Sequence, residues 1–171
     1  MTSNEQVFQC QFQLGIGSYY HMLRQSYFNA WHRFVSAFSL IFSTSAVAII
    51  SSKLEIGIFC AAIVAVLQAV DLIIDTRGQG SLHNDLRNKY LMLEHELLNY
   101  GSSLTELQFN DLQMKIKSIE LQEPPVRKLL LEVCHDDIAR RLKVDKAHFH
   151  NVHWFKANTA NMFNWPSVIK D

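Results

Sequence analysis

Two long apolar segments dominate the pattern of hydrophobic and polar positions along the chain. The first, FVSAFSLIFSTSAVAIISS, occupies residues 34–52 and contains no charged residue. The second, residues 56–74, contains only one, Asp71. A helix rises about 1.5 Å per residue, so each segment approaches the ~30 Å thickness of a bilayer core. The pattern predicts a two-helix transmembrane hairpin over residues 34–75, with spans at about 34–52 and 56–74. A buried helix of a soluble protein is the alternative for the second segment, because its uncharged core, residues 56–70, is only fifteen residues long.

The segment before the first span, residues 1–33, is polar but becomes rich in aromatic residues at helical spacing from Ile16 onward. Tyr and Trp concentrate at membrane–water interfaces, so we predict an interfacial or cytoplasmic helix that leads into the span, after a frayed start over residues 1–12. The alternative is a soluble amphipathic helix that packs on the rest of the domain.

The chain after the second span, residues 81–171, has the pattern of a helical bundle with an aromatic C-terminal tail. A stripe of apolar residues recurs every seven positions: Leu86, Leu93, Tyr100, Leu107, Met114 and Leu121. Gly101 and a capping box at 103–106 favour two helices, about 81–100 and 104–121, folded back on each other. Pro124 and Pro125 then interrupt the helical pattern before a further helix at about 126–142. The predicted fold class is therefore an all-α membrane protein with a cytoplasmic helical bundle.

Charge sets the predicted orientation. Lys53 is the only basic residue at the hairpin tip, whereas basic residues flank both outer span ends: Arg24, Arg33, Arg77, Arg87 and Lys89. Positive residues favour the cytoplasmic side, so both termini are predicted to be cytoplasmic. Sixteen basic and sixteen acidic residues give a formal net charge of zero, so we expect no nucleic-acid partner.

Small and hydroxyl-bearing residues follow regular spacings within the spans. Every fourth residue of one face of the second span is small: Gly57, Ala61, Ala65 and Ala69. This spacing predicts helix packing, because small side chains allow a neighbouring helix to approach closely. The first span places Ser36, Ser39 and Ser43 on one side. Two interpretations stay open for these serines: they pack the hairpin, or they line a water-filled path in an oligomer.

Three polar residues mark the cytoplasmic end of the second span: Gln68, Asp71 and Asp75. Ionisable groups near a membrane are costly and therefore functional candidates. We expect the Asp71 residues of several copies to form a ring at a pore mouth, or each Asp71 to pair with a basic residue of a neighbouring chain. Asp75 lies at the span end, where it could equally meet water or Arg77.

Motifs for catalysis or for cofactors are absent from the sequence. It contains no Gly-rich phosphate loop after a strand, no G-x-S-x-G motif and no paired cysteines. His148, His150 and His153 are close together, but their spacing matches no strong ligand motif. We therefore predict no enzyme, no catalytic residue, no cofactor and no metal site. The alternative is a membrane-tethered ribonuclease that uses Arg77 with His83 or Arg141 with His148.

Several short motifs, in this order, resemble the SLATT group of two-transmembrane proteins. They are Trp31-His32-Arg33, the Ser/Ala-rich first span, Asp71-Leu72-Ile73-Ile74-Asp75, His83-x-x-Leu86, Ile119-Glu120-Leu121-Gln122-Glu123-Pro124-Pro125 and Cys134-His135-Asp136-Asp137. The resemblance implies a homo-oligomeric protein of the bacterial inner membrane. It also implies a pore-forming or membrane-perturbing effector of a defence or phage-conflict system, activated by a protein trigger or partner.

A second functional class fits the same pattern. A membrane-anchored interaction or inhibitor module would bind a partner through its cytoplasmic helices without forming a pore. In both classes the partners are the lipid bilayer and other proteins, including further copies of this chain.

Overall fold

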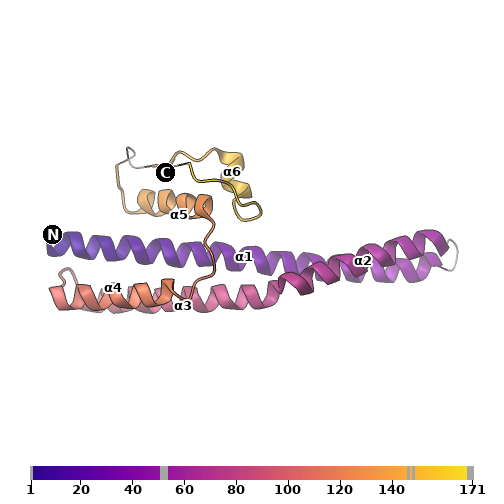
Figure 1. Cartoon of the computed structure of the whole chain (residues 1–171), viewed down its shortest axis with the longest axis horizontal. Helices are drawn as coiled ribbons and strands as arrows, with labels where there is room; N and C mark the ends of the chain where they lie inside the picture. Colours follow the sequence, from indigo (N-terminus) through magenta and orange to yellow (C-terminus); the bar gives the residue numbers. More distant parts are fainter. Residues whose placement is uncertain (1, 51–53, 146, 148, 169–171) are drawn as a thin grey trace. The chain divides into compact units, whose positions relative to one another are not determined.

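The computed structural model describes residues 2–50, 54–145, 147 and 149–168 (Figure 1). This part of the chain is helical and contains no β-strand. The polar link at 51–53, with Lys53, lies outside the described residues, as does His148. The helices are α1 (Ser3–Ile50), α2 (Leu54–Ile74), α3 (Thr76–Tyr100), α4 (Glu106–Glu120), α5 (Lys128–Arg141) and α6 (Trp154–Thr159).

The chain forms two compact units. The hairpin unit comprises Gln25–Leu82, and the bundle unit comprises Met1–Arg24 together with His83–Asp171. Both α1 and α3 contribute residues to each unit. The two units meet at 24/25 and 82/83, whereas the sequence pattern placed the hairpin at 34–75 and the cytoplasmic helices from residue 81.

In the hairpin unit, α2 runs antiparallel to the second half of α1 (Figure 1). Two side-chain contacts fix this pairing. The Gln68 amide donates to Ser39 Oγ at 2.7 Å, and His32 Nδ1 lies 3.1 Å from Asp71 Oδ2. From the first contact to the second, the residue number decreases on α1 and increases on α2, as expected for two antiparallel helices.

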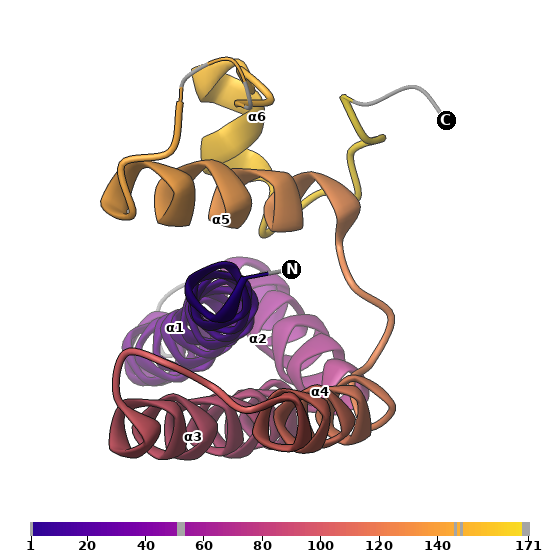
Figure 2. The same cartoon turned by 90° about the vertical axis from the view of Figure 1, so that its left-hand side faces the viewer.

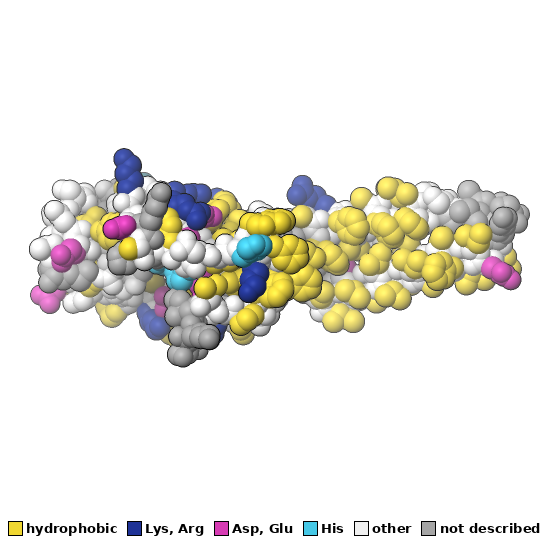
Figure 3. All heavy atoms as spheres, turned by 90° about the horizontal axis from the view of Figure 1, so that it is seen from above, with side chains coloured by type: hydrophobic (Ala, Val, Ile, Leu, Met, Phe, Trp, Pro, Cys, Tyr) yellow, Lys and Arg dark blue, Asp and Glu magenta, His cyan; other side chains and the backbone are white. Residues whose placement is uncertain are grey.

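The outward faces of the hairpin unit are apolar. Its exposed large apolar side chains come from both helices and include Leu40, Ile41, Ile58, Phe59, Val66, Leu72 and Ile73. Hydrophobic side chains also dominate the face of α2 and the adjoining α1 seen in Figure 3. Within the described residues, one helix, beginning at Leu54, is long and apolar enough to cross a membrane, and only 6% of its apolar window is buried. A core helix of a soluble protein would be mostly buried.

The first turns of α1 belong to the core of the bundle unit. Cys10 and Leu14 are fully buried against Leu86, Leu97 and Leu112 from α3 and α4. The expected frayed start over residues 1–12 is therefore wrong, because α1 begins at Ser3 and its apolar positions pack at once. Figure 2 shows this part of α1 between α3 and α4 on one side and α5 and α6 on the other.

A second apolar cluster joins α1 to α5 and α6. Tyr20 packs here with Leu129, Leu130, Cys134 and Ala160. The hydroxyl of Tyr20 accepts a hydrogen bond from the backbone N–H of Arg127 at 3.0 Å. Tyr20 therefore belongs to the core of the bundle unit, whereas Phe34, at the other end of the aromatic segment, is exposed. The interfacial helix over residues 1–33 stays a prediction.

The seven-residue stripe does not continue from α3 into α4. Leu86 and Leu93 are buried, whereas the later stripe members Leu107, Met114 and Leu121 are exposed. The turn at Gly101, which has a φ of 81°, resets the register, so that α4 buries Leu112, Ile116 and Ile119 instead. The prediction of two helices is confirmed, since α3 ends at Tyr100 and α4 begins at Glu106.

The capping box of α4 lies two residues later than predicted. Thr105 is the N-cap: its hydroxyl accepts from the N–H of Gln108, and the Gln108 side chain accepts from the N–H of Thr105. Leu104, which lies between Ser103 and this cap, is buried before the helix begins. The N–H and carbonyl of Leu104 are both paired with the Ser3 hydroxyl.

Candidate functional site

A cleft of about 760 Å³ opens into the bundle unit. Residues from α1, α3, α4 and α5 line it, together with the proline-containing connection before α5 and part of the C-terminal segment. Two histidine clusters reach the cleft. One contains His21, and the other contains His135 and His150.

The first cluster centres on two buried imidazoles. His21 on α1 and His83 on α3 are both almost fully buried, and their Nδ1 atoms lie 2.8 Å apart. His21 Nε2 lies 3.1 Å from Glu123 Oε1. A carboxylate accepts hydrogen bonds, so we assign the ring hydrogen of His21 to Nε2 and the donating Nδ1–H to His83.

Glu123 also joins the cluster to Tyr90. The Tyr90 hydroxyl donates to Glu123 Oε1 at 2.6 Å, within the range of a charge-assisted hydrogen bond. The Pro124–Pro125 break follows at once and removes Glu123 from helical geometry, which lets its carboxylate reach back to α1 and α3.

Burial controls the protonation of this cluster. Burial, helped by the neighbouring His21 and Arg24 and opposed by Glu123, lowers the pKa of His83 to about 4. Burial also raises the pKa of Tyr90 well above its usual range, with the hydrogen bond to Glu123 acting in the same direction. At neutral pH, therefore, His83 is uncharged and Tyr90 keeps its proton.

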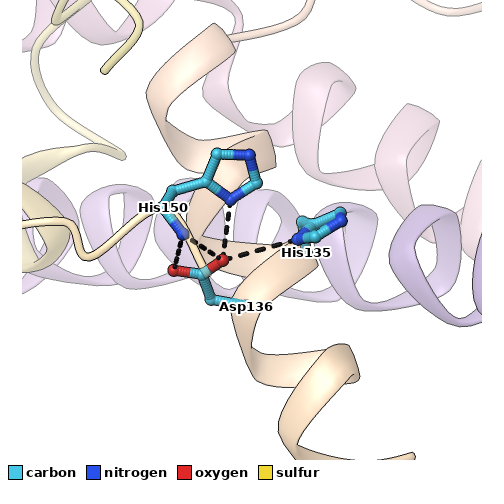
Figure 4. A group of neighbouring side chains, drawn as sticks. All are labelled: His135, Asp136 and His150. Atoms are coloured by element: carbon cyan, nitrogen blue, oxygen red, sulfur yellow. Dashed lines mark hydrogen bonds and ion pairs between the residues drawn. The ribbon is translucent and has the colours of Figure 1, made fainter. Parts of the chain in front are cut away.

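The second cluster contains His135 and Asp136 of α5 and His150 of the segment that follows (Figure 4). Asp136 Oδ1 lies 2.7 Å from His150 Nδ1 and 3.4 Å from His135 Nδ1. The backbone N–H of His150 donates to both carboxylate oxygens of Asp136. Burial opposes ionisation of Asp136, but these hydrogen bonds outweigh it and leave the pKa of the carboxyl below its usual value.

The predicted serine face divides in the structure. Ser39 is buried and accepts a hydrogen bond from Gln68, whereas Ser36 and Ser43 are exposed in the single chain. The sequence identified Gln68 as a polar candidate but indicated no hydrogen-bond partner for it. The structure shows that its partner is Ser39.

The predicted small-residue face divides as well. Gly57 is buried in the hairpin unit, while the three alanines that continue its spacing, Ala61, Ala65 and Ala69, are exposed. Within a single chain, only the glycine end of this face is covered.

Asp71 and Asp75 have separate structural roles. Asp71 uses Oδ2 for His32 and accepts from the Thr76 hydroxyl at Oδ1, at 2.6 Å. Asp75 lies between α2 and α3 with a φ of 48°, and its Oδ1 accepts from the N–H of Gly78. An Asp side chain tolerates this left-handed conformation and caps the next helix, so Asp75 forms the joint between the two helices.

Three residues of the proposed nuclease pairs lie in the described part of the chain. Arg77 is exposed, whereas His83 is buried beside His21. The guanidinium of Arg141 stacks on the ring of Tyr19 at 4.7 Å, and His148 lies outside the described residues. The third tail histidine, His153, caps α6 by accepting from the N–H of Phe155.

Sequence reasoning named several of these residues singly, in motifs or in the nuclease alternative, but did not group them into the two histidine clusters. One signal was present: His21 lies next to Tyr20 on a helix face that also carries buried apolar residues. A polar residue on a buried face needs a partner, but the partners of His21 lie 62 and 102 positions away. Comparison of the chain with protein-family models, curated protein sequences and solved structures finds no match.

Proposed function

We propose that this chain is a homo-oligomeric membrane protein that perturbs a bilayer by forming a pore. The hairpin unit lies in the membrane as two spans, and the bundle unit stays in the cytoplasm with both termini. The observation that supports this proposal is the exposed apolar surface of the hairpin unit, to which α2 and the second half of α1 both contribute. Contiguous apolar surface of this kind marks a membrane or protein interaction site.

The polar groups of the hairpin unit support the membrane location. Ser39 pairs with Gln68, and Asp71 pairs with His32 and Thr76, all inside the unit. Other hydroxyls on the outer face of α1 bond carbonyls of their own helix, as Thr44 and Ser45 do with Ile41. Satisfying polar groups internally is what a lipid environment requires.

The exposed small residues support assembly of several copies. Ala61, Ala65 and Ala69 leave room for a neighbouring helix to approach α2 closely. Ser36 and Ser43 are free of the intrachain bond that holds Ser39 and would face the water path of a closed ring. The resemblance to the SLATT group agrees with this assignment.

Proteoliposomes test the pore directly. Purified protein should release a small dye or carry current across an otherwise tight bilayer, and the protein should be larger than a dimer in detergent. The Ser36→Leu/Ser43→Leu variant should lose conductance. Ser45→Leu is the matched control, since Ser45 lies about half a turn around α1 from Ser36.

A membrane-anchored binding module is the second candidate, favoured by the cleft of the bundle unit. It predicts inserted but tight proteoliposomes, a monomer or dimer in detergent, and no effect of the serine substitutions. Fusions of alkaline phosphatase to each terminus test the orientation. Activity of a C-terminal fusion in the periplasm would contradict cytoplasmic termini.

A further inference from the structure

We propose that His135, Asp136 and His150 form a binding site for one divalent transition-metal ion with the ligand preferences of zinc. Each residue offers one ligand atom, and these three atoms lie within 4.8 Å of one another. Two imidazole nitrogens and one carboxylate oxygen are a ligand set that suits such ions.

The two distances between Asp136 and the histidines are close to those around a tetrahedral ion. Metal–ligand bonds of 2.0–2.1 Å place two ligand atoms about 3.3 Å apart. His135 Nδ1 already lies 3.4 Å from Asp136 Oδ1. His150 Nδ1 is closer, at 2.7 Å, because a proton now joins it to the carboxylate. Replacement of that proton by the metal ion requires these two atoms to separate by about half an ångström.

The surrounding structure holds the three ligands in place. Asp136 is only 3% exposed, and the Asp136 carboxylate accepts a hydrogen bond from the backbone N–H of His150. The His135 ring packs edge-on against Phe12 at 4.9 Å and against the His150 ring at 4.6 Å. The two rings therefore aim at one carboxylate oxygen, as Figure 4 shows.

The cleft gives the ion an entry path and an open position. Both histidines line the cleft of about 760 Å³. Three protein ligands leave the fourth position of a tetrahedral ion for water or for an anionic group that enters the cleft. This site belongs to the bundle unit and does not depend on pore formation.

Titration of the full-length, tag-free protein in detergent tests the site. We expect one Zn²⁺ per chain by calorimetry and, with Co²⁺, the strong visible absorption of a four-coordinate ion. His135→Gln should weaken Zn²⁺ binding about 100-fold or more, since removal of even an outer-shell partner costs 10–100-fold. His95→Gln is the matched control, because His95 is exposed on α3, and it should bind as the parent protein does.

Asp136→Asn should also weaken binding, with circular dichroism as the check on its fold. If Asp136→Asn unfolds, His135→Gln decides the question, since His135 is partly exposed and its hydrogen-bonding contact with Asp136 is long, at 3.4 Å. The absence of saturable Zn²⁺ binding would overturn the proposal. Equal affinity of His135→Gln and His95→Gln would overturn it as well.

Discussion

His21 and His83 share one hydrogen between Nδ1 atoms that are 2.8 Å apart in the interior of the bundle unit. This contact exists only while one ring donates and the other accepts, so a second proton on the pair would set two N–H groups against each other. Glu123 and Arg24 are the charged groups that face the pair and bear on the pKa of His83.

Acid should therefore destabilise the bundle unit through His83. Its pKa is about 4 in the fold and 6.5 in the unfolded chain, so the unfolded state takes up the proton first. The stability contribution is complete above pH 6.5 and is lost as pH falls toward 4, by about 3 kcal/mol at most. Denaturation in detergent at pH 7.5 and pH 5 measures it. His83→Gln should show a smaller difference between the two pH values, whereas His95→Gln should behave as the parent protein.

Tyr90→Phe should destabilise the bundle unit by about 1–3 kcal/mol, because it removes a donor from the part-buried Glu123 carboxylate. Tyr100→Phe is a matched control. Tyr100 donates to Glu96 one turn away on the same helix at a similar distance, 2.7 Å, but near the surface. Tyr100→Phe should lower the free energy of unfolding by less than about 1 kcal/mol, since water can replace the lost hydrogen bond. Equal losses in thermal unfolding of the two variants would contradict the role given to Glu123.

Asp71→Ala should destabilise the hairpin unit by about 1–3 kcal/mol, because His32 and Thr76 both lose their acceptor. Asp71→Asn keeps an oxygen for the Thr76 hydroxyl and should lose less. Unfolding in detergent micelles compares the two variants. An unchanged unfolding midpoint for Asp71→Ala would mean that the contacts at the end of α2 do not hold the unit together.

Thr105→Ala should destabilise α4 by about 1 kcal/mol, because Thr105 is the N-cap. Ser103→Ala should be close to neutral, although the sequence favoured Ser103 as the cap. Chemical denaturation of the two variants measures the difference. The opposite order of stabilities would restore the cap position expected from the sequence.

Those two positions show what local pattern can and cannot decide. Both Ser103 and Thr105 are followed three residues later by Glu or Gln, so each forms a valid capping box. The choice depends on Leu104, whose burial and pairing with Ser3 come from a residue 101 positions away. Helix content, the Gly101 break and the proline interruption are local properties and were predicted. Register and cluster partners are set by tertiary packing.

The histidine clusters were missed for the same reason. His135 and Asp136 are adjacent, but the third member of their cluster, His150, returns to them across a loop. The sequence grouped His150 with His148 and His153 by proximity, whereas the structure uses His153 as a helix cap. Proximity in sequence is a poor guide to a site that a fold-back assembles.

Gly15 and Gly17 provide a test of packing around the His21 cluster. In a helix interior, Gly→Ala normally stabilises by about 1 kcal/mol. A Cβ at Gly17 would lie 2.5 Å from the Tyr90 ring, which is buried and held at its hydroxyl by Glu123. The ring cannot withdraw without loss of that bond, so Gly17→Ala should destabilise by about 1–3 kcal/mol.

Gly15→Ala is the matched control two residues earlier. Its Cβ would meet a methyl group of Ile138 at 3.3 Å, which a small side-chain shift relieves. We therefore expect Gly15→Ala to be neutral or slightly stabilising in thermal unfolding. The double variant Gly17→Ala/Tyr90→Leu should lose less stability than the sum of the two single losses, since the smaller side chain makes room for the new methyl group. Additive losses in that double variant would show that the ring of Tyr90 is not what excludes a side chain at position 17.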